Sequence, residues 1–163
     1  ELGKGTKVNI RFELELAPDK VPELKDQKEQ DTEDALQGKK VLLVEDHPIN
    51  AEIAEKLLTR KGVIVTCAEN GKIAVDRFIG YEEGFFDAVL MDVRMPVMDG
   101  LEATHIIRSL DRADAQKIPI IAMTANAFDE DRDATLQAGM VAHIAKPISP
   151  KELYSTLINN ILV

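Results

Sequence analysis

The sequence predicts a doubly wound α/β fold, in which helices cover both faces of a five-stranded parallel sheet. Five short apolar runs follow one another from residue 39 onward, and an amphipathic segment comes after each run. The third of these runs has no polar alternation, which is typical of a strand buried on both faces. Alternating strands and helices form parallel sheets with right-handed crossovers. We expect the strand order 2-1-3-4-5, one of the two common orders for such sheets.

The predicted strands share short runs of aliphatic side chains bounded by polar or turn-forming residues. Such runs are too short for helices that are apolar all round, and they match the usual length of buried strands. The five strands are expected at Val41–Val44, Val63–Ala68, Ala88–Met91, Ile118–Met123 and Val141–Ala145.

The first three predicted helices are recognised by their boundaries. Apolar residues recur at helical spacing between Ile49 and Leu58, and Gly62 ends that helix. Asn70-Gly71 opens the second helix and Asp99-Gly100 the third.

Two further helices complete the alternation. The fourth is expected from about Asn126 to Ala138, with Gly139 ending it. The fifth has Ser149 as its N-cap, Pro150 in its first turn and Glu152 three residues after the cap, which predicts a capping box. Altogether, five helices are predicted.

The chain divides into three zones. Residues 1–16 alternate between apolar and polar side chains, as in a half-buried strand whose partners are missing. Residues 17–38 carry seven acidic residues against three lysines and few large apolar side chains, which predicts a linker. Residues 39–163 form the predicted α/β domain. The apolar face of residues 1–16 is expected to pack on a sheet edge or a neighbouring molecule, which makes oligomers possible.

Composition excludes several classes of function. The formal net charge of the 163 residues is −9, which argues against nucleic acid as a partner because phosphate binding needs a basic surface. No apolar stretch approaches the roughly 20 residues that span a bilayer, and no signal peptide opens the chain. The single Cys67 has no partner thiol and is expected in the core. The sequence therefore predicts a cytoplasmic protein without direct membrane contact.

Polar side chains gather where the predicted strands end. In the order 2-1-3-4-5 the first and third strands are neighbours, so Glu45, Asp46 and Asp92 converge at the switch point of the sheet. Three carboxylates in one place repel each other and commonly hold a cation. Because every ligand is a hard oxygen, Mg²⁺ is the expected metal. Thr124 ends the fourth strand and Lys146 follows the fifth, at the same edge.

Residues 39–163 resemble the receiver domain of two-component response regulators. The resemblance rests on four motifs: Val-Leu-Leu-Val-Glu-Asp before residue 47, Met-Asp-Val-Arg-Met-Pro-Val-Met-Asp-Gly before residue 101, Thr-Ala-Asn from residue 124, and Lys-Pro from residue 146. It implies the flavodoxin-like receiver fold, a site that binds Mg²⁺, and a phosphorylated aspartate.

The resemblance assigns a role to each matching position. Asp92 matches the phosphorylated aspartate, Glu45 and Asp46 match the acidic metal-binding pair, and Arg94 matches the residue whose backbone carbonyl binds Mg²⁺. Three further positions match the rest of the site: Thr124 the switch hydroxyl, Lys146 the lysine that contacts phosphate, and Pro147 the proline that follows a cis peptide bond.

Two positions depart from the usual receiver pattern. Glu45 stands where aspartate is commoner, which should reposition one metal ligand without removing it. His143 stands where the switch aromatic, usually tyrosine or phenylalanine, is found. A switching role for His143 and a plain packing role in the fifth strand both remain open.

The N-terminal zone resembles the end of a histidine-kinase ATP-binding domain, through Leu-Gly-Lys-Gly-Thr at residues 2–6 and the alternating strand after it. This resemblance implies that the parent protein is a hybrid sensor histidine kinase, which can be membrane-anchored, with a C-terminal receiver. The fragment itself lacks the phosphorylated-histidine helix and the nucleotide-binding core, so it is not expected to act as a kinase.

The function implied is that of a phosphoacceptor in a two-component phosphorelay. Asp92 would take a phosphoryl group from the phosphohistidine of a histidine kinase or a histidine phosphotransfer protein. A flavodoxin-type binder is disfavoured because Glu45 and Asp46 would repel a flavin phosphate. A dehalogenase-type phosphatase needs a second aspartate at the position of Arg94. The main alternative is a degenerate receiver that acts as a non-phosphorylated interaction module.

Overall fold

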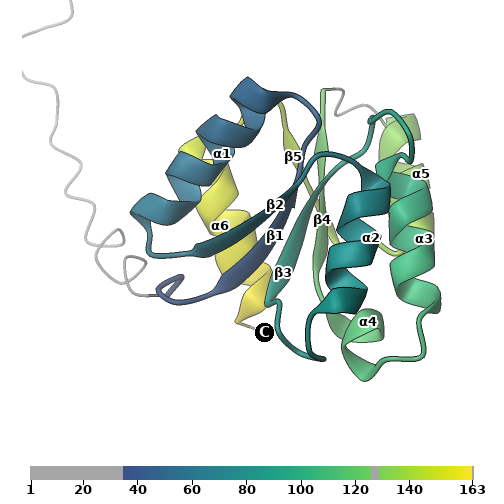
Figure 1. Ribbon diagram of the computed structural model, residues 1–163. Helices are drawn as coiled ribbons and strands as arrows, with labels where there is room; N and C mark the ends of the chain where they lie inside the picture. The colour runs from purple at the N-terminus through teal and green to yellow at the C-terminus, as the bar shows by residue number, and fades with distance from the viewer. Residues whose placement is uncertain (1–34, 126–128, 163) are drawn as a thin grey trace, which may run out of the picture.

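The computed structural model describes residues 35–125 and 129–162, with the side chains of residues 129–132 left aside. The strand expected in residues 1–16, most of the linker expected in residues 17–38, and the first residues of the fourth predicted helix lie outside this description. Within it, a twisted sheet stands between two layers of helices (Figure 1).

The sheet has the predicted strand order. Its five strands are hydrogen-bonded in the order β2-β1-β3-β4-β5, and every neighbouring pair is parallel. The three inner strands are almost entirely buried, whereas β2 and β5 at the sides are more exposed, because only inner strands are covered on both edges and both faces. The strands are β1 (Lys40–Val44), β2 (Ile64–Ala68), β3 (Ala88–Asp92), β4 (Ile120–Thr124) and β5 (Ala142–Ala145).

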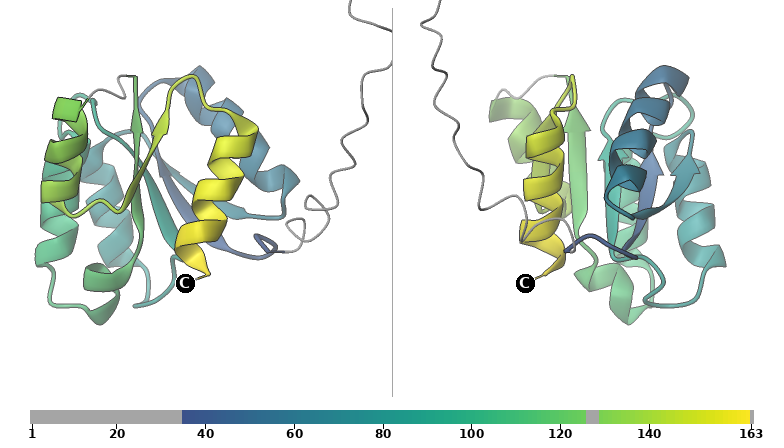
Figure 2. Two further views of the ribbon diagram at one scale, coloured as in Figure 1. Left: turned by 180° about the vertical axis from the view of Figure 1, so that it is seen from behind. Right: turned by 90° about the vertical axis from the view of Figure 1, so that its left-hand side faces the viewer.

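Helices cover both faces of the sheet. Helices α1 and α6 lie on one face, and α2, α3 and α5 lie on the other (Figures 1 and 2). The helices are α1 (Pro48–Arg60), α2 (Gly71–Gly80), α3 (Gly100–Ser109), α4 (Ala113–Lys117), α5 (Asp129–Ala138) and α6 (Pro150–Ile161).

The hydrophobic core consists of two clusters, one on each face of the sheet. Successive residues of a strand point to opposite faces, so Leu42 packs in the cluster beneath α2 and α3, and Leu43 packs in the cluster beneath α1 and α6. Because both faces are covered, the polar residues of the inner strands stand only at strand ends, as Lys40, Asp92 and Thr124 do. Both clusters hold the strands rigidly, and the strand ends therefore have fixed relative positions.

The packed domain begins before residue 39, where the sequence placed its boundary. Leu36 is fully buried and belongs to the cluster beneath α1 and α6. The turn at residues 35–38 is tied to the fold because the Gly38 amide donates a hydrogen bond to the Gly62 carbonyl over 2.9 Å. Leu36 and this turn therefore pack with the α/β domain, ahead of the boundary expected at residue 39. A single apolar residue amid polar neighbours gives no periodic signal, so sequence patterning missed it.

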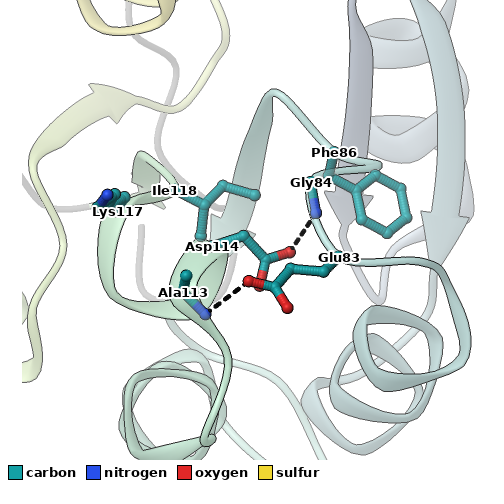
Figure 3. Close-up of a pocket in the computed structure, with 7 residues that line it drawn as sticks. All are labelled: Glu83, Gly84, Phe86, Ala113, Asp114, Lys117 and Ile118. Carbon is teal, nitrogen blue, oxygen red and sulfur yellow. Dashed lines mark hydrogen bonds between the residues drawn. The ribbon is translucent and has the colours of Figure 1, made fainter.

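Helix α4 was not predicted. Its five residues, Ala-Asp-Ala-Gln-Lys, bury only Ala115 and show no helical apolar period. Distant residues determine this helix. The Glu83 carboxylate accepts a hydrogen bond from the Ala113 amide over 2.8 Å, and the Asp114 carboxylate accepts one from the Gly84 amide over 2.8 Å (Figure 3). The four residues that make these contacts line a shallow pocket, which Figure 3 shows. Helix α4 itself lies at the amino-terminal edge of the sheet, near the bottom of Figure 1.

The capping box expected at the start of α6 does not form as predicted. Ser149 is the N-cap of α6 by its backbone conformation, but its side chain makes no capping hydrogen bond. Glu152 instead approaches the end of β5, where its carboxylate oxygen lies 3.5 Å from the Ala145 amide nitrogen. The helix still begins where it was predicted, because Pro150 suits the first helical turn.

Candidate functional site

The carboxyl-terminal edge of the sheet brings the predicted acidic residues together. Asp92 is the last residue of β3, and Glu45 and Asp46 follow β1, which is the neighbouring strand. One carboxylate oxygen from each of these three residues lies within 4.8 Å of the others. The sequence predicted this convergence from the strand order alone, and the register of β1 and β3 produces it.

Asp92 has a hydrogen-bond partner at each of its carboxylate oxygens. It is 6% exposed, and its two oxygens accept hydrogen bonds from Lys146 Nζ over 2.6 Å and from the Arg94 amide over 3.1 Å. Burial raises the pKa of Asp92 above its ordinary value, and the hydrogen bonds from Lys146 and Arg94 offset only part of that shift. The nearby charge of Glu45 raises the pKa further.

Lys146 connects two of the three carboxylates. Its Nζ lies 2.6 Å from Asp92 Oδ2 and 2.5 Å from Glu45 Oε2. Burial by itself would lower the pKa of Lys146, but the hydrogen bonds and charges of Asp92 and Glu45 outweigh it and raise that pKa. One ammonium group thus stands against a cluster of three acids, and the cluster keeps an excess of negative charge.

Glu45 and Asp92 share a single cation in this pocket. Glu45 is 4% exposed, and its Oε2 lies 2.5 Å from Lys146 Nζ, the ammonium that Asp92 also contacts. Because one lysine faces a cluster of three carboxylates, negative charge remains that a further cation would neutralise. The atoms available as metal ligands are carboxylate oxygens, which suit a hard ion such as Mg²⁺. The residues present therefore fit Mg²⁺.

The loop after β3 fixes the backbone of Asp92. Gly100 packs so closely that a Cβ atom at this position would lie 2.2 Å from the Asp92 carbonyl oxygen. The Gly100 amide donates to the Val93 carbonyl over 3.0 Å, and the Asp99 side chain caps α3 by accepting from the Glu102 amide over 2.8 Å. Only glycine permits this approach, which explains why Asp99-Gly100 follows the strand at this distance.

The remaining predicted site residues lie at the same edge of the sheet. Thr124 is the last residue of β4 and is 6% exposed, and its carbonyl accepts a hydrogen bond from the Lys146 amide over 2.8 Å. The peptide bond between Lys146 and Pro147 is cis, as the resemblance implied. His143 lies half-buried in β5, beside Ala122 of β4. Arg94 is exposed in the loop after β3.

Sequence reasoning missed one residue of the site. Asn50, in the first turn of α1, donates a hydrogen bond from Nδ2 to Glu45 Oε1 over 2.9 Å. The spacing of five residues across a strand-to-helix turn carries no standard signature. The contact depends on the direction in which α1 leaves the sheet, and tertiary packing sets that direction.

Comparison with known proteins identifies this architecture. Residues 41–158 match the response regulator receiver domain family. The chain belongs to this family. The receiver domain is similar to parts of longer proteins: it is 39% identical over 120 residues to a hybrid signal transduction histidine kinase I from Dictyostelium discoideum, and 40% identical over 115 residues to the sensor protein GacS from Pseudomonas syringae. These matches cover 72% and 70% of this chain but only 7% and 12% of those relatives.

Solved structures of receiver domains have the same fold. The receiver domain of the sensor histidine kinase PA1611 from Pseudomonas aeruginosa, crystallised with a magnesium ion coordinated in its active-site cleft, is 42% identical with a TM-score of 0.69. The match covers 77% of this chain and 99% of that one. A co-crystal structure of the Saccharomyces cerevisiae phosphotransfer protein Ypd1 with the Ssk1 receiver domain gives 25% identity, a TM-score of 0.69, and coverages of 78% and 91%.

The helices of the receiver domain are all short or amphipathic. Within residues 35–125 and 129–162, none combines the length and the apolar character that crossing a bilayer requires.

Proposed function

We propose that this receiver domain accepts a phosphoryl group on Asp92 from a phosphohistidine and passes on or reports the signal. The observation that carries the proposal is the arrangement around Asp92, whose carboxylate is buried at the edge of the sheet, bonded to Lys146, and adjacent to Glu45 and Asp46. Family membership and the similarity to receiver domains of histidine kinases support it.

The reaction follows from the chemistry of the side chains. The ionised carboxylate of Asp92 attacks the phosphorus atom, the phosphorus–nitrogen bond to the donor histidine breaks, and an acyl phosphate forms on Asp92. The leaving imidazole keeps the electron pair of the broken bond and takes a proton. Lys146 already lies 2.6 Å from the carboxylate, so its ammonium can neutralise charge on the transferred oxygens.

Glu45, Asp46 and Asp92 are the side chains proposed to hold Mg²⁺, together with the backbone carbonyl of Arg94. The ion, when bound, would neutralise negative charge that develops on the phosphoryl oxygens. The acidic cluster would then be relieved of its excess charge, because Lys146 alone balances one of three carboxylates.

The conformational change that follows phosphorylation of Asp92 is proposed to involve Thr124. Thr124 ends the strand next to that of Asp92, and its hydroxyl can donate a hydrogen bond to the new phosphoryl oxygens, which would shift the end of β4. This shift would bias the surface formed by α5, β5 and α6 between two arrangements. His143, half-buried on β5, is the residue whose environment that change would alter.

The proposed partners are a histidine kinase or a histidine phosphotransfer protein. The Ypd1–Ssk1 complex shows that a similar receiver domain binds a phosphotransfer protein. We also propose that the parent protein is a hybrid sensor histidine kinase and that residues 1–16 end its ATP-binding domain. Its relatives include hybrid histidine kinases, of which the chain spans only a small share.

A phosphorylation assay tests the proposal. The chain is incubated with Mg²⁺ and a small acyl phosphate and then weighed intact by mass spectrometry. One phosphoryl group is expected on the wild type and none on Asp92→Ala, whereas Asp76→Ala, which removes an exposed aspartate of α2, should behave as the wild type. A stoichiometric adduct on Asp92→Ala would overturn the assignment of Asp92. A folded wild type that gains no phosphoryl group would instead support a non-phosphorylated interaction module.

A further inference from the structure

The two oxygens of Glu45 have different surroundings. Oε1 accepts a hydrogen bond from Asn50 Nδ2 over 2.9 Å, whereas Oε2 lies 2.5 Å from Lys146 Nζ, the ammonium that Asp92 also contacts. Asn50 therefore holds one oxygen, and the other lies beside the lysine that Glu45 shares with Asp92. The orientation of the carboxylate is thus set from α1 as well as from the acidic cluster.

Glutamate needs such an anchor more than aspartate does. Its side chain has one more rotatable bond, so the carboxylate of Glu45 can adopt more orientations, and ordering them opposes metal binding. Asn50 is well placed to remove this freedom because α1 is anchored in the core through Ala54 and Leu58. Groups that hold a metal ligand from behind commonly have a large effect on metal affinity.

We propose that Asn50 is a positioning residue that holds Glu45 in the orientation required for Mg²⁺ binding, and that it compensates for glutamate at this position. The inference rests on the proposed function, since it concerns the same metal site. It assigns a specific role to a residue that the sequence motifs did not single out. Asn50 acts through Glu45 and does not itself contact the phosphoryl group.

The first experiment compares two asparagines. Mg²⁺ affinity of the whole chain is measured by isothermal titration calorimetry. Asn50→Ala is expected to weaken Mg²⁺ binding about tenfold, in line with the usual effect of losing a group behind a metal ligand. Asn70→Ala is the matched control, because Asn70 caps α2 by accepting from the Ile73 amide and should affect stability but leave Mg²⁺ affinity unchanged.

Phosphorylation kinetics separate positioning from a general loss of structure. In Asn50→Ala the Mg²⁺ concentration that gives half the maximal rate should rise by the same factor as the dissociation constant. The rate at saturating Mg²⁺ should stay within about twofold of the wild type, because Asp92 and Lys146 are unchanged. A fall in the maximal rate with an unchanged half-saturating concentration would overturn the proposal.

A double-mutant cycle tests the link to glutamate. The shorter side chain of Glu45→Asp cannot keep the contact with Asn50. Adding Asn50→Ala to Glu45→Asp should therefore change Mg²⁺ affinity by about twofold or less, because the two substitutions remove the same contact and their effects do not add. A full tenfold loss in both backgrounds would show that Asn50 acts independently of Glu45, and would overturn the inference. If the wild type itself fails to bind Mg²⁺ or accept a phosphoryl group, the proposed function fails instead.

Discussion

Two aspartates at opposite edges of the sheet have similar partners but opposite pKa shifts. Asp92, at the carboxyl-terminal edge, accepts hydrogen bonds from Lys146 and the Arg94 amide. Asp114, at the amino-terminal edge, accepts them from Arg112 and the Gly84 amide. The pKa of Asp92 is raised and the pKa of Asp114 is lowered.

The difference arises from burial and from neighbouring charge. Burial raises the pKa of both carboxyls, but at Asp114 the two hydrogen bonds of Arg112 and the Gly84 amide outweigh it. At Asp92 burial outweighs the hydrogen bonds, and Glu45, a further acid, competes for the same lysine. The amino-terminal edge is therefore electrostatically satisfied and stabilises the fold. The carboxyl-terminal edge retains repulsion between carboxylates, which a bound cation would relieve.

Arg112 and Arg108 extend this satisfied network at the amino-terminal edge. The guanidinium of Arg112 also donates to the Phe78 carbonyl over 2.9 Å, which ties α4 to the end of α2. The guanidinium of Arg108 donates to the carbonyls of Ala115, Ile118 and Gly139. These contacts join α3, α4 and the end of α5, and among the described side chains no acidic group pairs with Arg108.

The largest expected loss of stability comes from a substitution near the amino-terminal edge of the sheet. Leu36→Ala should lower the free energy of unfolding by about 3 kcal/mol, because it leaves a cavity in a fully buried site. Leu136→Ala, the same change at a residue that is 52% exposed on α5, should cost less than about 0.5 kcal/mol. Urea unfolding measures both values. Equal losses would contradict the assignment of Leu36 to the core.

Deletion variants extend the same test. Removal of residues 1–34 should leave the free energy of unfolding of the domain nearly unchanged, if these residues are a linker and the end of another domain. Removal of residues 1–38 should cost at least as much as Leu36→Ala. A large loss on the shorter deletion, at concentrations where the chain is monomeric, would show that residues 1–34 stabilise the receiver domain.

The next effect compares the two aspartates directly. Asp114→Asn should lower the free energy of unfolding by about 2 kcal/mol, because it weakens charge-assisted hydrogen bonds to Arg112. Phosphorylation of Asp92 should remain intact in this variant, since Asp114 lies at the other edge of the sheet. Thermal and urea unfolding, with the mass-spectrometric assay, check both results. A stabilised Asp114→Asn would refute the contrast between the edges.

The smallest expected change in the free energy of unfolding is a gain in stability, not a loss. Asp92→Asn removes one charge from a crowded acidic cluster and should raise the stability of the metal-free protein at neutral pH by about 1 kcal/mol. Added Mg²⁺ should stabilise the wild type more than the variant, because a ligand that binds the folded state raises stability by mass action. Melting curves with chelator and with Mg²⁺ measure the two differences. A metal-free variant that melts below the wild type would contradict the crowded-carboxylate interpretation.

The two aspartates also differ in their pH dependence. Because the folded pKa of Asp92 is raised, its charge destabilises the fold above that pKa, and the advantage of Asp92→Asn should shrink as pH falls toward the ordinary value of 3.8. Because the folded pKa of Asp114 is lowered, its contribution is present above 3.8 and is lost as pH falls below it. Unfolding curves measured on both sides of pH 3.8 should show the effect of Asp92→Asn changing above this pH and that of Asp114→Asn changing below it. If both effects changed over the same pH range, the opposite pKa shifts would be contradicted.

Much of the fold and the site follows from the sequence alone. Unbroken apolar runs predict inner strands, and the alternation with helices predicts a parallel sheet. Once the strand order is inferred, Glu45 and Asp92 must meet, because neighbouring parallel strands end at the same edge. This determination is possible because strand periodicity and helix boundaries are local properties, which a short stretch of chain expresses without its surroundings.

The tertiary structure alone decided the features that depend on distant partners. Helix α4 has no apolar period, and contacts from Glu83 and Arg112 determine it. Leu36 is buried because α1 and the sheet leave space for it, and Asn50 meets Glu45 because of the path by which α1 leaves β1. The opposite pKa shifts of Asp92 and Asp114 likewise depend on burial and on neighbours remote in sequence, since electrostatic energies are set by distance and solvent access in space.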